Sequence, residues 1–486
     1  MEETANLEQE IAKIEAELSN LANRRSQLLA DLTQLRRQLL HNNTPAQLSL
    51  SLQETSLNNQ SPQEEKIQLF RSLFKGREDV FPRRFVNTKT GKSGYAPVCR
   101  NEWASGICQK PKIACQECNF RAFVPVSDEI IRHHLRGNDP DESSGKDFTI
   151  GVYPLLTDET CWFLAVDFDK STWADDAKAF LETCKSYQVP TALERSRSGN
   201  GAHVWIFFET PVLATLARKL GTLLLTNTMN LRPEIGMDSY DRLFPSQDTM
   251  PKGGFGNLIA LPLQKKPREQ NNSVFVDQDM NPYSDPWAFL SSLQKMTAKE
   301  VERLVKNVQD EGEITGVRAV VSEENENEPW KLTPSRKNKE IAITGPFPDP
   351  LNMVISNQIY IEKEGLPASL RNRIIRIAAF QNPEFYKAQA MHLSTFGKPR
   401  IISCCENYPK HLALPRGCLE ELNQVLEDLE INTSQIDERM IGNPVSLDFQ
   451  GTLRPEQQLA ADQLIQYDIG VLSASTAFGK TVLVHG

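Results

Sequence analysis

The sequence predicts a mixed α/β (α+β) fold, because apolar runs of strand length alternate with longer runs that have helical spacing. Strands are expected over residues 148–153, 162–166, 191–195, 202–208 and 259–263, the first two as neighbours, and helices over 173–187 and 213–229. Two observations indicate where chemistry should lie in this fold. One apolar run ends on Asp167 and Asp169, and another follows a glycine-containing turn at residues 198–201.

Composition sets limits on the class of protein. The chain has 486 residues, enough for more than one domain, and a net charge of −9, so any contact with nucleic acid must come from local basic patches. No apolar run is long enough to span a bilayer and the acidic N-terminus has no signal peptide, so we expect a cytoplasmic protein without a membrane partner. In a reducing compartment the nine cysteines favour metal ligation over disulfides.

Residues 1–40 are predicted to form a coiled coil. Leucine or isoleucine recurs every seven residues from Leu7 to Leu35, and a second apolar series from Ile11 to Leu39 fills the complementary positions. Arg25 takes the one core position that is not apolar. The pattern indicates self-association or docking of a partner protein and does not separate the two. Residues 41–63, rich in Asn, Gln and Ser, are expected to be a flexible linker.

A cysteine cluster lies within residues 95–125. Its four members fall within 20 residues, at Cys99, Cys108, Cys115 and Cys118. Four thiolates that close on a Cys-x2-Cys pair suit a tetrahedral structural Zn²⁺ site with no open coordination position. We therefore expect a zinc module that stabilises a segment with little core of its own and takes no part in catalysis. Four unrelated cysteines are the alternative.

Asp167 and Asp169 are candidate metal ligands. Alternate side chains of a strand share a face, so both carboxylates should point the same way from the strand end. Neighbouring carboxylates repel each other unless a cation lies between them, and Mg²⁺ commonly binds one or two carboxylates together with substrate phosphates. The turn at Ser198–Gly201 exposes backbone amides that could approach a phosphate, and His203 follows it. Taken alone, each piece also fits an ordinary loop or hairpin turn.

Together, in this order, the two pieces resemble motifs I and II of the archaeo-eukaryotic primase superfamily, Asp-x-Asp and Ser-Gly-x-Gly-x-His. Longer stretches resemble the primase part of bacterial TOTE conflict-system proteins, and CRISPR-associated primase-polymerases share much of this sequence. These stretches are Phe81–Phe85, Tyr95–Cys99, Tyr240–Asp248 and Gly253–Gln264. The likeness runs from about residue 66 to residue 306 and continues into a helicase, so we assign residues 64–310 to the primase domain.

The resemblance implies an RRM-like catalytic core and a DNA primase-polymerase that acts on a single-stranded DNA template in a bacterial conflict or antiviral defence system. It also implies a two-metal Mg²⁺ or Mn²⁺ site held by Asp167, Asp169 and a third acid. Asp241 is favoured as that acid because it falls where the third strand of the family should end, while Asp248 and Asp238 stay open. The use of deoxynucleotides or ribonucleotides, and priming as opposed to extension, also stay open.

The second motif is implied to hold the incoming nucleoside triphosphate. Its phosphates would contact Ser198, Gly199, Gly201 and His203, with His203 as a hydrogen-bond donor rather than a base. Further candidate phosphate contacts are the basic residues near the motifs: Arg195, Arg197, Arg242 and Lys252.

Three further segments follow the primase part. Residues 311–340 are polar and acidic and are predicted to be a linker. Residues 341–447 form a second globular region, with a basic helix expected over 369–381, and resemble a small DNA-binding module that precedes the motor in some superfamily 2 helicases. Residues 448–486 resemble the start of a RecA-like helicase domain.

This last segment has the pattern of a phosphate-binding P-loop. The apolar run that begins at Gly470 is expected to be a strand that leads into Gly479, Lys480 and Thr481. Lys480 would contact the β- and γ-phosphates of ATP and Thr481 its Mg²⁺. Ala477 stands where a P-loop usually has its first glycine. Because no further helicase motif follows before residue 486, we expect a fragment without helicase or ATPase activity.

Two functions from different classes fit the sequence. One is a metal-dependent nucleotidyltransferase. The other is a catalytically silent nucleic-acid-binding scaffold that recruits partners through its coiled coil. The presence of both motifs favours the enzyme, since a silent relic would more often have lost one of them.

Overall fold

The computed structural model describes residues 57–87, 89–138, 147–306, 343, 345–440, 442–443, 451–467 and 470–485. The predicted coiled coil at 1–40, most of the linker at 41–63 and the acidic linker at 311–340 lie outside the described residues. In the part of the chain that is described, no helix is both long enough and apolar enough to pass through a membrane.

A five-stranded antiparallel sheet is the centre of residues 57–306. Its strands are β4 Thr160–Phe168, β5 Ala192–Arg195, β6 Ala202–Leu213, β7 Leu243–Phe244 and β9 Val274–Phe275, in the order β7-β4-β6-β5-β9. The register of β4 and β6 sets Phe163 opposite Phe207 and Asp167 opposite His203. Both segments are rich in aromatic and β-branched residues, which suit a pleated, buried surface.

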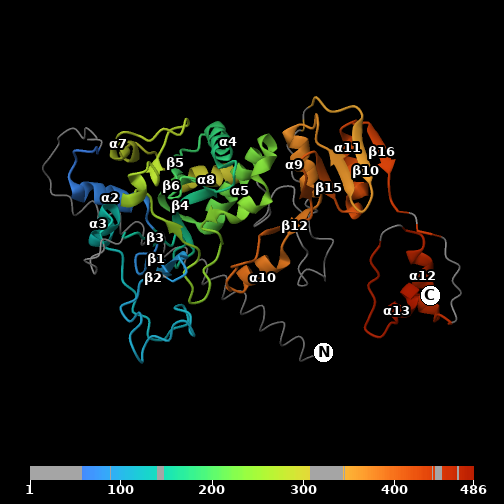
Figure 1. Ribbon diagram of the computed structural model, residues 1–486, viewed down its shortest axis with the longest axis horizontal. Coiled ribbons are helices and arrows are strands. Elements are labelled where there is room, and N and C mark those ends of the chain that lie inside the picture. The colour runs from blue at the N-terminus through green and yellow to red at the C-terminus, as the bar shows by residue number, and fades with distance from the viewer. Residues whose placement is uncertain are drawn as a thin grey trace, which may run out of the picture. The chain divides into compact units, whose positions relative to one another are not determined.

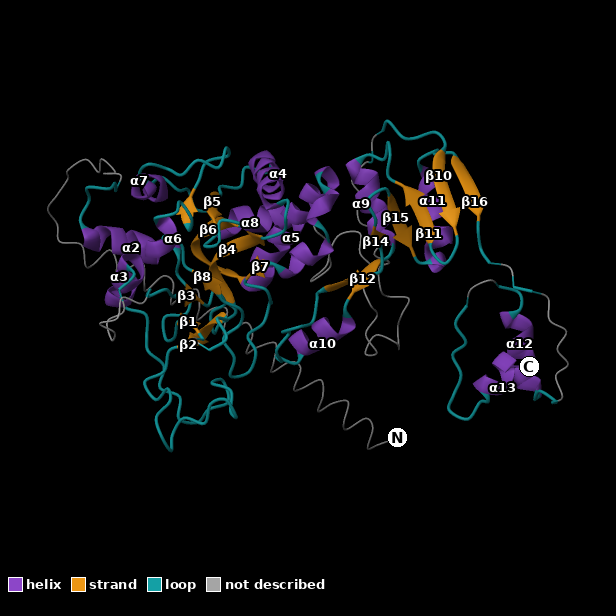
Figure 2. Ribbon diagram, in the orientation of Figure 1, coloured by secondary structure: helices purple, strands orange, loops and turns teal. Residues whose placement is uncertain are grey.

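Helices cover both faces of this sheet, as Figures 1 and 2 show. The helices of the first face are α4 Trp173–Ser186, α5 Ala214–Leu231 and α8 Ala298–Val305, and those of the second face are α2 Gln63–Leu73, α3 Asp128–Arg136 and α7 Pro286–Ser291. Leu164 and Ile206 belong to the core of the first face, and Phe163 and Trp205 to the core of the second. Successive side chains of a strand alternate between faces, so β4 and β6 contribute to both cores. The prediction of a mixed α/β fold is confirmed.

Smaller elements surround the central sheet. They are the hairpin of β1 Pro82–Val86 and β2 Ser93–Pro97, the pair of β3 Gly151–Val152 and β8 Ile259–Ala260, and the turns η1 Pro233–Ile235, η2 Met237–Asp241 and α6 Lys265–Arg268. The prediction that residues 148–153 and 162–166 form neighbouring strands is wrong. β3 pairs with β8, whereas β4 pairs with β6 and β7. Strand pairing depends on contacts between distant segments, which a local pattern does not reveal.

Residues 351–437 form a second sheet with its own core. The elements are β10 Leu351–Ile355, β11 Ile359–Glu362, α9 Ala368–Ile377, β14 Glu406–Asn407, β15 His411–Leu414, η6 Arg416–Cys418, α11 Leu419–Asp428 and β16 Thr433–Asp437. The strand order is β14-β15-β11-β10-β16, and the core includes Ile361, Ile374 and Leu422. The helix expected over residues 369–381 ends earlier, at Ile377, because the chain then pairs as a strand with Ile401–Ser403.

An arm of this second region packs on the first. The arm consists of β12 Ala379–Gln381, α10 Pro383–Ala390 and β13 Ile401–Ser403. Its residues Ala379 and Ile401 are buried in the core of the α4/α5 face of the central sheet. The arm therefore fixes the segment around η2, which precedes β7, against the second region.

The last described elements are α12 Pro455–Leu464 and α13 Lys480–His485. The strand expected to begin at Gly470 is not formed: residues 470–474 have no regular structure, so this prediction is wrong. A strand needs hydrogen-bonded neighbours, and none of the described strands pairs with this segment, whose Val471 is 95% exposed.

His134 of α3 is fully buried and gives the fold a dependence on pH. Its Nε2 lies 2.9 Å from the carbonyl oxygen of Pro262, and its Nδ1 lies 3.2 Å from the backbone N–H of Ile150, which donates to it. Burial lowers the pKa of His134 from 6.5 to about 4. The unfolded chain therefore binds this proton before the folded chain does, and stability is lost as the pH falls from about 6.5 to about 4, by about 3 kcal/mol in all.

We predict that His134→Gln, which keeps a donor and an acceptor, flattens this dependence. Denaturant unfolding of both proteins at pH 7 and pH 4.5 measures the effect. An equal loss of stability in the variant and the wild type would contradict the assignment.

Candidate active site

Asp167 and His203 lie side by side at one end of the central sheet. They are directly opposite each other on the antiparallel strands β4 and β6, and His203 Nε2 is 3.6 Å from Asp167 Oδ1. Directly opposed residues of a strand pair share a face, which explains why two motifs about 35 positions apart meet here. This pairing brings motif I and motif II together at one end of the sheet.

Asp169 lies just beyond the end of β4, and its carboxylate is bound by an arginine side chain. Arg242 forms an ion pair with its carboxylate, and Arg242 Nη2 is also 3.5 Å from Asp238 Oδ2. Lys170 Nζ reaches the other oxygen of Asp238 at 2.6 Å. In this structure a guanidinium therefore supplies a positive charge to the Asp169 carboxylate. Through Arg242, Asp169 is linked to Asp238, which was the least favoured third acid.

A buried carboxylate, Glu194 of β5, lies behind His203. Glu194 is 1% exposed, and its Oε2 lies 2.9 Å from His203 Nδ1. The indole N–H of Trp205 donates to the same oxygen at 3.0 Å, and the hydroxyl of Ser273 donates to Oε1 at 3.4 Å. Burial opposes a charge on the His203 ring, but the nearby carboxylates of Glu194 and Asp167 outweigh it and raise the pKa of His203.

Sequence analysis missed Glu194. The available signal was a charged residue inside the short apolar strand Ala192–Arg195, in the hairpin that continues to His203. In the register of this hairpin Glu194 is directly opposite His203, so the three residues Asp167, His203 and Glu194 share one face on three adjacent strands.

The turn between β5 and β6 is held tight by hydrogen bonds within it. The backbone N–H of Ser196 donates to the carbonyl of Gly201 at 2.8 Å, and the N–H of Asn200 donates to the hydroxyl of Ser198 at 3.2 Å. Gly199 has φ +79°, and a Cβ there would lie 2.7 Å from Asn272 Oδ1. A Cβ on Gly201 would lie 2.7 Å from the carbonyl oxygen of Phe168. Both glycines are therefore required by the backbone, and the second keeps the turn against the end of β4.

Three of the predicted phosphate-contacting cations, Arg195, Arg197 and Lys252, lie in different surroundings. Arg197 lies on the second face of the sheet, where it bonds Gln264 and reaches Asp147 at 3.3 Å. Arg195 follows Glu194 directly in β5, so its side chain lies on the opposite face of the sheet from Glu194. Its guanidinium donates to the carbonyls of Asn271 (3.1 Å) and Met280 (2.5 Å). The structure therefore does not bring Arg195 to His203. The backbone N–H of Lys252 donates to the carbonyl of His392 at 2.9 Å.

The TOTE conflict system, Archaeo-Eukaryotic Primase domain family matches residues 65–304. This span contains the whole central sheet together with Asp167, Asp169, Ser198 and His203. The chain carries an archaeo-eukaryotic primase domain of the TOTE family. Membership indicates a primase-like nucleotidyltransferase of a conflict system, and it confirms the resemblance drawn from the two motifs. A search of curated proteins finds no match to this chain.

In the primase domain, the carboxylate of Asp241 is bound by a residue that follows the arm helix α10. Its Oδ1 accepts a hydrogen bond from the backbone N–H of Arg400 at 2.8 Å, and burial raises its pKa. Asp248 is buried against two cations, 2.9 Å from Arg218 Nε and 3.9 Å from Arg400 Nη1. Neither side chain is gathered with Asp167 and Asp169. Arg218 and Arg400, the partners of these two carboxylates, lie far from them along the chain. The sequence around Asp241 and Asp248 therefore does not predict these contacts.

We predict that Asp248→Ala destabilises the primase domain by about 3–5 kcal/mol, because Arg218 and Arg400 would be left buried without their counter-charge. Denaturant unfolding measures the loss. Asp279→Ala, in an exposed turn, is the matched control and should change stability by less than about 0.5 kcal/mol. Wild-type stability in Asp248→Ala would refute a structural role and return Asp248 to the list of candidate metal ligands.

The four predicted zinc ligands surround one small cavity. Cys99, Cys108, Cys115 and Cys118 all line it, and the backbone N–H of Ala122 donates to Cys99 Sγ at 3.3 Å. The donor set is chemically suited to Zn²⁺. Across the described residues, however, no three His, Cys, Asp or Glu side chains are drawn together as a metal-binding group, either here or at Asp167.

In the segment with the P-loop pattern, the side chain of Lys480 is bonded to the backbone of the preceding loop. Lys480 Nζ donates to the carbonyls of Ala474 and Ser475, both at 3.0 Å. Gly479 has φ +87°, and Gln457 lies so close that a Cβ would be 2.5 Å from its Nε2. Gln457 also donates to the carbonyl of Phe478 at 2.8 Å, which links α12 to the loop. α13 begins at Lys480, and Thr481 is its second residue.

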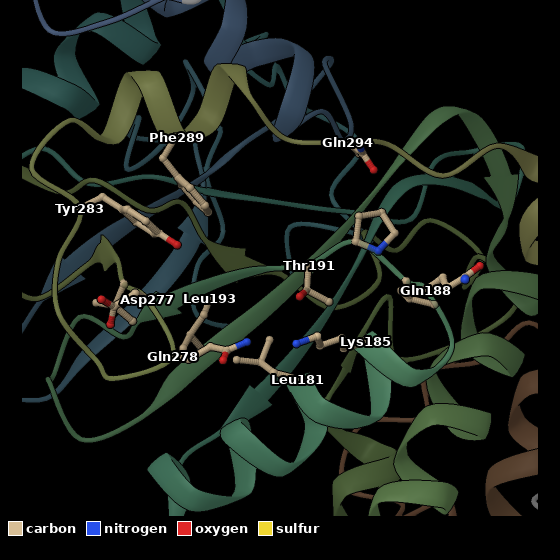
Figure 3. A pocket seen from close by; sticks show the side chains of 13 residues that line it. Leu181, Lys185, Gln188, Thr191, Leu193, Asp277, Gln278, Tyr283, Phe289 and Gln294 are labelled. Atoms are coloured by element: carbon tan, nitrogen blue, oxygen red, sulfur yellow. The ribbon is translucent and has the colours of Figure 1, made fainter.

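A separate cavity of about 450 Å³ lies beyond the first face of β5, between α4 and residues 276–294 (Figure 3). Tyr283 and Phe289 stack in it with ring centroids 4.0 Å apart. Its one carboxylate, Asp277, already accepts two backbone N–H groups, of Asp279 and Asn281. None of the predicted site residues lines this cavity, so it is not the active site.

Proposed function

We propose that this protein is a metal-dependent DNA primase-polymerase that transfers nucleotides on a single-stranded DNA template. The observation that supports it is the juxtaposition of Asp167 and His203 on paired strands, with Asp169 beyond the end of the same strand. Asp167 would bind a metal ion and His203 a phosphate oxygen, and the two side chains are 3.6 Å apart. The phosphates of one nucleoside triphosphate could therefore contact both motifs.

Asp167 and Asp169 would hold Mg²⁺ or Mn²⁺. When bound, the metal ions would polarise the reacting phosphate and lower the pKa of the attacking 3′-hydroxyl. The ion pair of Arg242 with Asp169 supports this role, because the guanidinium shows that the position accepts a positive charge. We infer that Arg242 moves from Asp169 to a phosphate oxygen when metal and nucleotide bind. Asp238, on the other side of Arg242, is our candidate for the third acid.

His203 would donate a hydrogen bond from Nε2 to a phosphate oxygen of the incoming nucleotide, and its raised pKa favours the protonated ring that this needs. The backbone N–H groups of the turn at Ser198–Gly201 would bind the same phosphates. We also propose a structural Zn²⁺ at the four cysteines and ATP binding at Gly479, Lys480 and Thr481.

The test is incorporation of labelled nucleotides on single-stranded DNA, with and without a primer, in Mg²⁺, Mn²⁺ or EDTA. We expect metal-dependent product that EDTA abolishes. The unprimed reaction decides between a primase and an extending polymerase, and parallel reactions with deoxy- and ribonucleotides identify the substrate. No product under any condition, from folded protein, would reject the proposal in favour of a silent nucleic-acid-binding scaffold.

A further inference from the structure

Glu194 is the most fully buried carboxylate in contact with the proposed active site. Its side chain is 2% exposed and sits among aromatic residues of the second core, including Trp205 and Phe275. A carboxylate in such a place is costly unless hydrogen bonds and a charge compensate for lost water. Trp205 and Ser273 donate to it as neutral groups, and His203 Nδ1 is the third polar atom within hydrogen-bond distance of its oxygens.

The contact fixes both the rotation and the protonation pattern of the imidazole. Glu194 is an acceptor, so the 2.9 Å contact with Nδ1 requires the proton to be on that nitrogen. The ring can then turn only by breaking this bond. Nε2 is held on the opposite side, 3.6 Å from Asp167 Oδ1. The indole of Trp205, which stands at 82° to the imidazole, binds the same carboxylate oxygen and holds it in place.

We propose that Glu194 is a positioning residue of the nucleotidyl-transfer site, which holds the imidazole of His203 with Nε2 turned toward Asp167 and the phosphates of the incoming nucleotide. The inference rests on the proposed function and adds to it a third strand, β5. Partners that orient a functional histidine in this way commonly change activity by about 10–100-fold when removed.

The kinetic test compares two substitutions of Glu194 that differ in one property. Glu194→Gln keeps an acceptor oxygen for Nδ1–H and should retain kcat/KM for the nucleotide within about 5-fold, whereas Glu194→Met removes the acceptor at similar size and should lower it about 10–100-fold. Ser273→Ala, which removes a neutral donor from the same carboxylate, is the matched control and should lie within about 3-fold of wild type. A Glu194→Gln variant as impaired as Glu194→Met would overturn the proposal.

A double-mutant cycle separates positioning from a general structural role. Added to His203→Ala, Glu194→Met should cost less than about 3-fold more, because no ring remains to be positioned. An additional loss as large as in the wild-type background would contradict the proposal. Should Glu194→Met not fold, Glu194→Ala, which leaves room for water, takes its place with the same expectations.

A readout that needs no activity keeps this inference distinct from the proposed function. In protein with ¹⁵N-labelled histidines and no nucleotide, the His203 signals, identified by their loss in His203→Ala, should show a protonated Nδ1 in wild type and Glu194→Gln. In Glu194→Met they should show an average over ring states. Unchanged signals in Glu194→Met would refute the inference. If the wild type makes no product, the proposed function fails and this ring signature alone decides whether Glu194 holds the ring.

Discussion

Replacing Asp167 by Asn should lower nucleotide incorporation by about 1,000-fold or more. The substitution keeps the size of the side chain but removes the charge that would bind the catalytic metal, and metal-ion stabilisation of phosphoryl transfer amounts to several kcal/mol. Asp167 lies at the end of β4 with its side chain 25% exposed, so the fold should tolerate the change. Incorporation on primed single-stranded DNA in Mg²⁺ measures the effect.

The matched control for this prediction is Asp175→Asn on α4. Its carboxylate is 70% exposed and lies 3.5 Å from Arg232, which places it outside the proposed site. This variant should synthesise DNA at the wild-type rate, and both variants should unfold at the wild-type denaturant concentration. Retained synthesis by Asp167→Asn would show that the carboxylate does not hold a required metal.

The second large effect is expected at the cysteine cluster. Replacing Cys115 and Cys118 by Ser should release about one zinc ion per chain and unfold the loop segment around residues 99–123, because structural zinc sites supply the folding free energy of small modules that have little core. The segment fits this description, since Trp103 and Phe120 are 70% and 56% exposed. Elemental analysis and limited proteolysis measure zinc content and local unfolding.

Cys404→Ser is the control for zinc release, because Cys404 is exposed and belongs to the second region. It should keep its zinc and resist protease as the wild type does. A wild-type protein that is folded and active yet contains no zinc, purified without chelator, would contradict the assignment of these four cysteines.

The fold was predictable where the signal is local. The helices at residues 173–187 and 213–229 correspond to α4 and α5, and the apolar runs correspond to β4, β5 and β6. Pairing between strands was not predictable, since β3 joins β8 and not the next strand along the chain. The helix expected to reach residue 381 ends at Ile377 for the same reason: Ala379–Gln381 is recruited as a strand by Ile401–Ser403.

The candidate site likewise contains residues that a local pattern indicates and residues whose role depends on distant contacts. Asp167, Asp169, Ser198 and His203 could be proposed from the sequence because the residues of each motif lie close together along the chain. Asp241 was favoured from its place in the sequence, but its carboxylate accepts the N–H of Arg400, a residue from the arm. Glu194 was overlooked because its importance depends on lying opposite His203 in the register of a hairpin. In each case the missing information was a partner far from the residue along the chain.

The central claim is that Asp167 and Asp169 bind the catalytic metal with His203 facing the nucleotide. Anomalous diffraction from crystals grown with Mn²⁺ and a non-hydrolysable nucleoside triphosphate tests it most directly. We predict a manganese peak bound by both carboxylates, Arg242 displaced from Asp169, and a phosphate oxygen within hydrogen-bond distance of His203 Nε2. Nucleotide bound elsewhere, or manganese bound without Asp167 and Asp169, would contradict the claim.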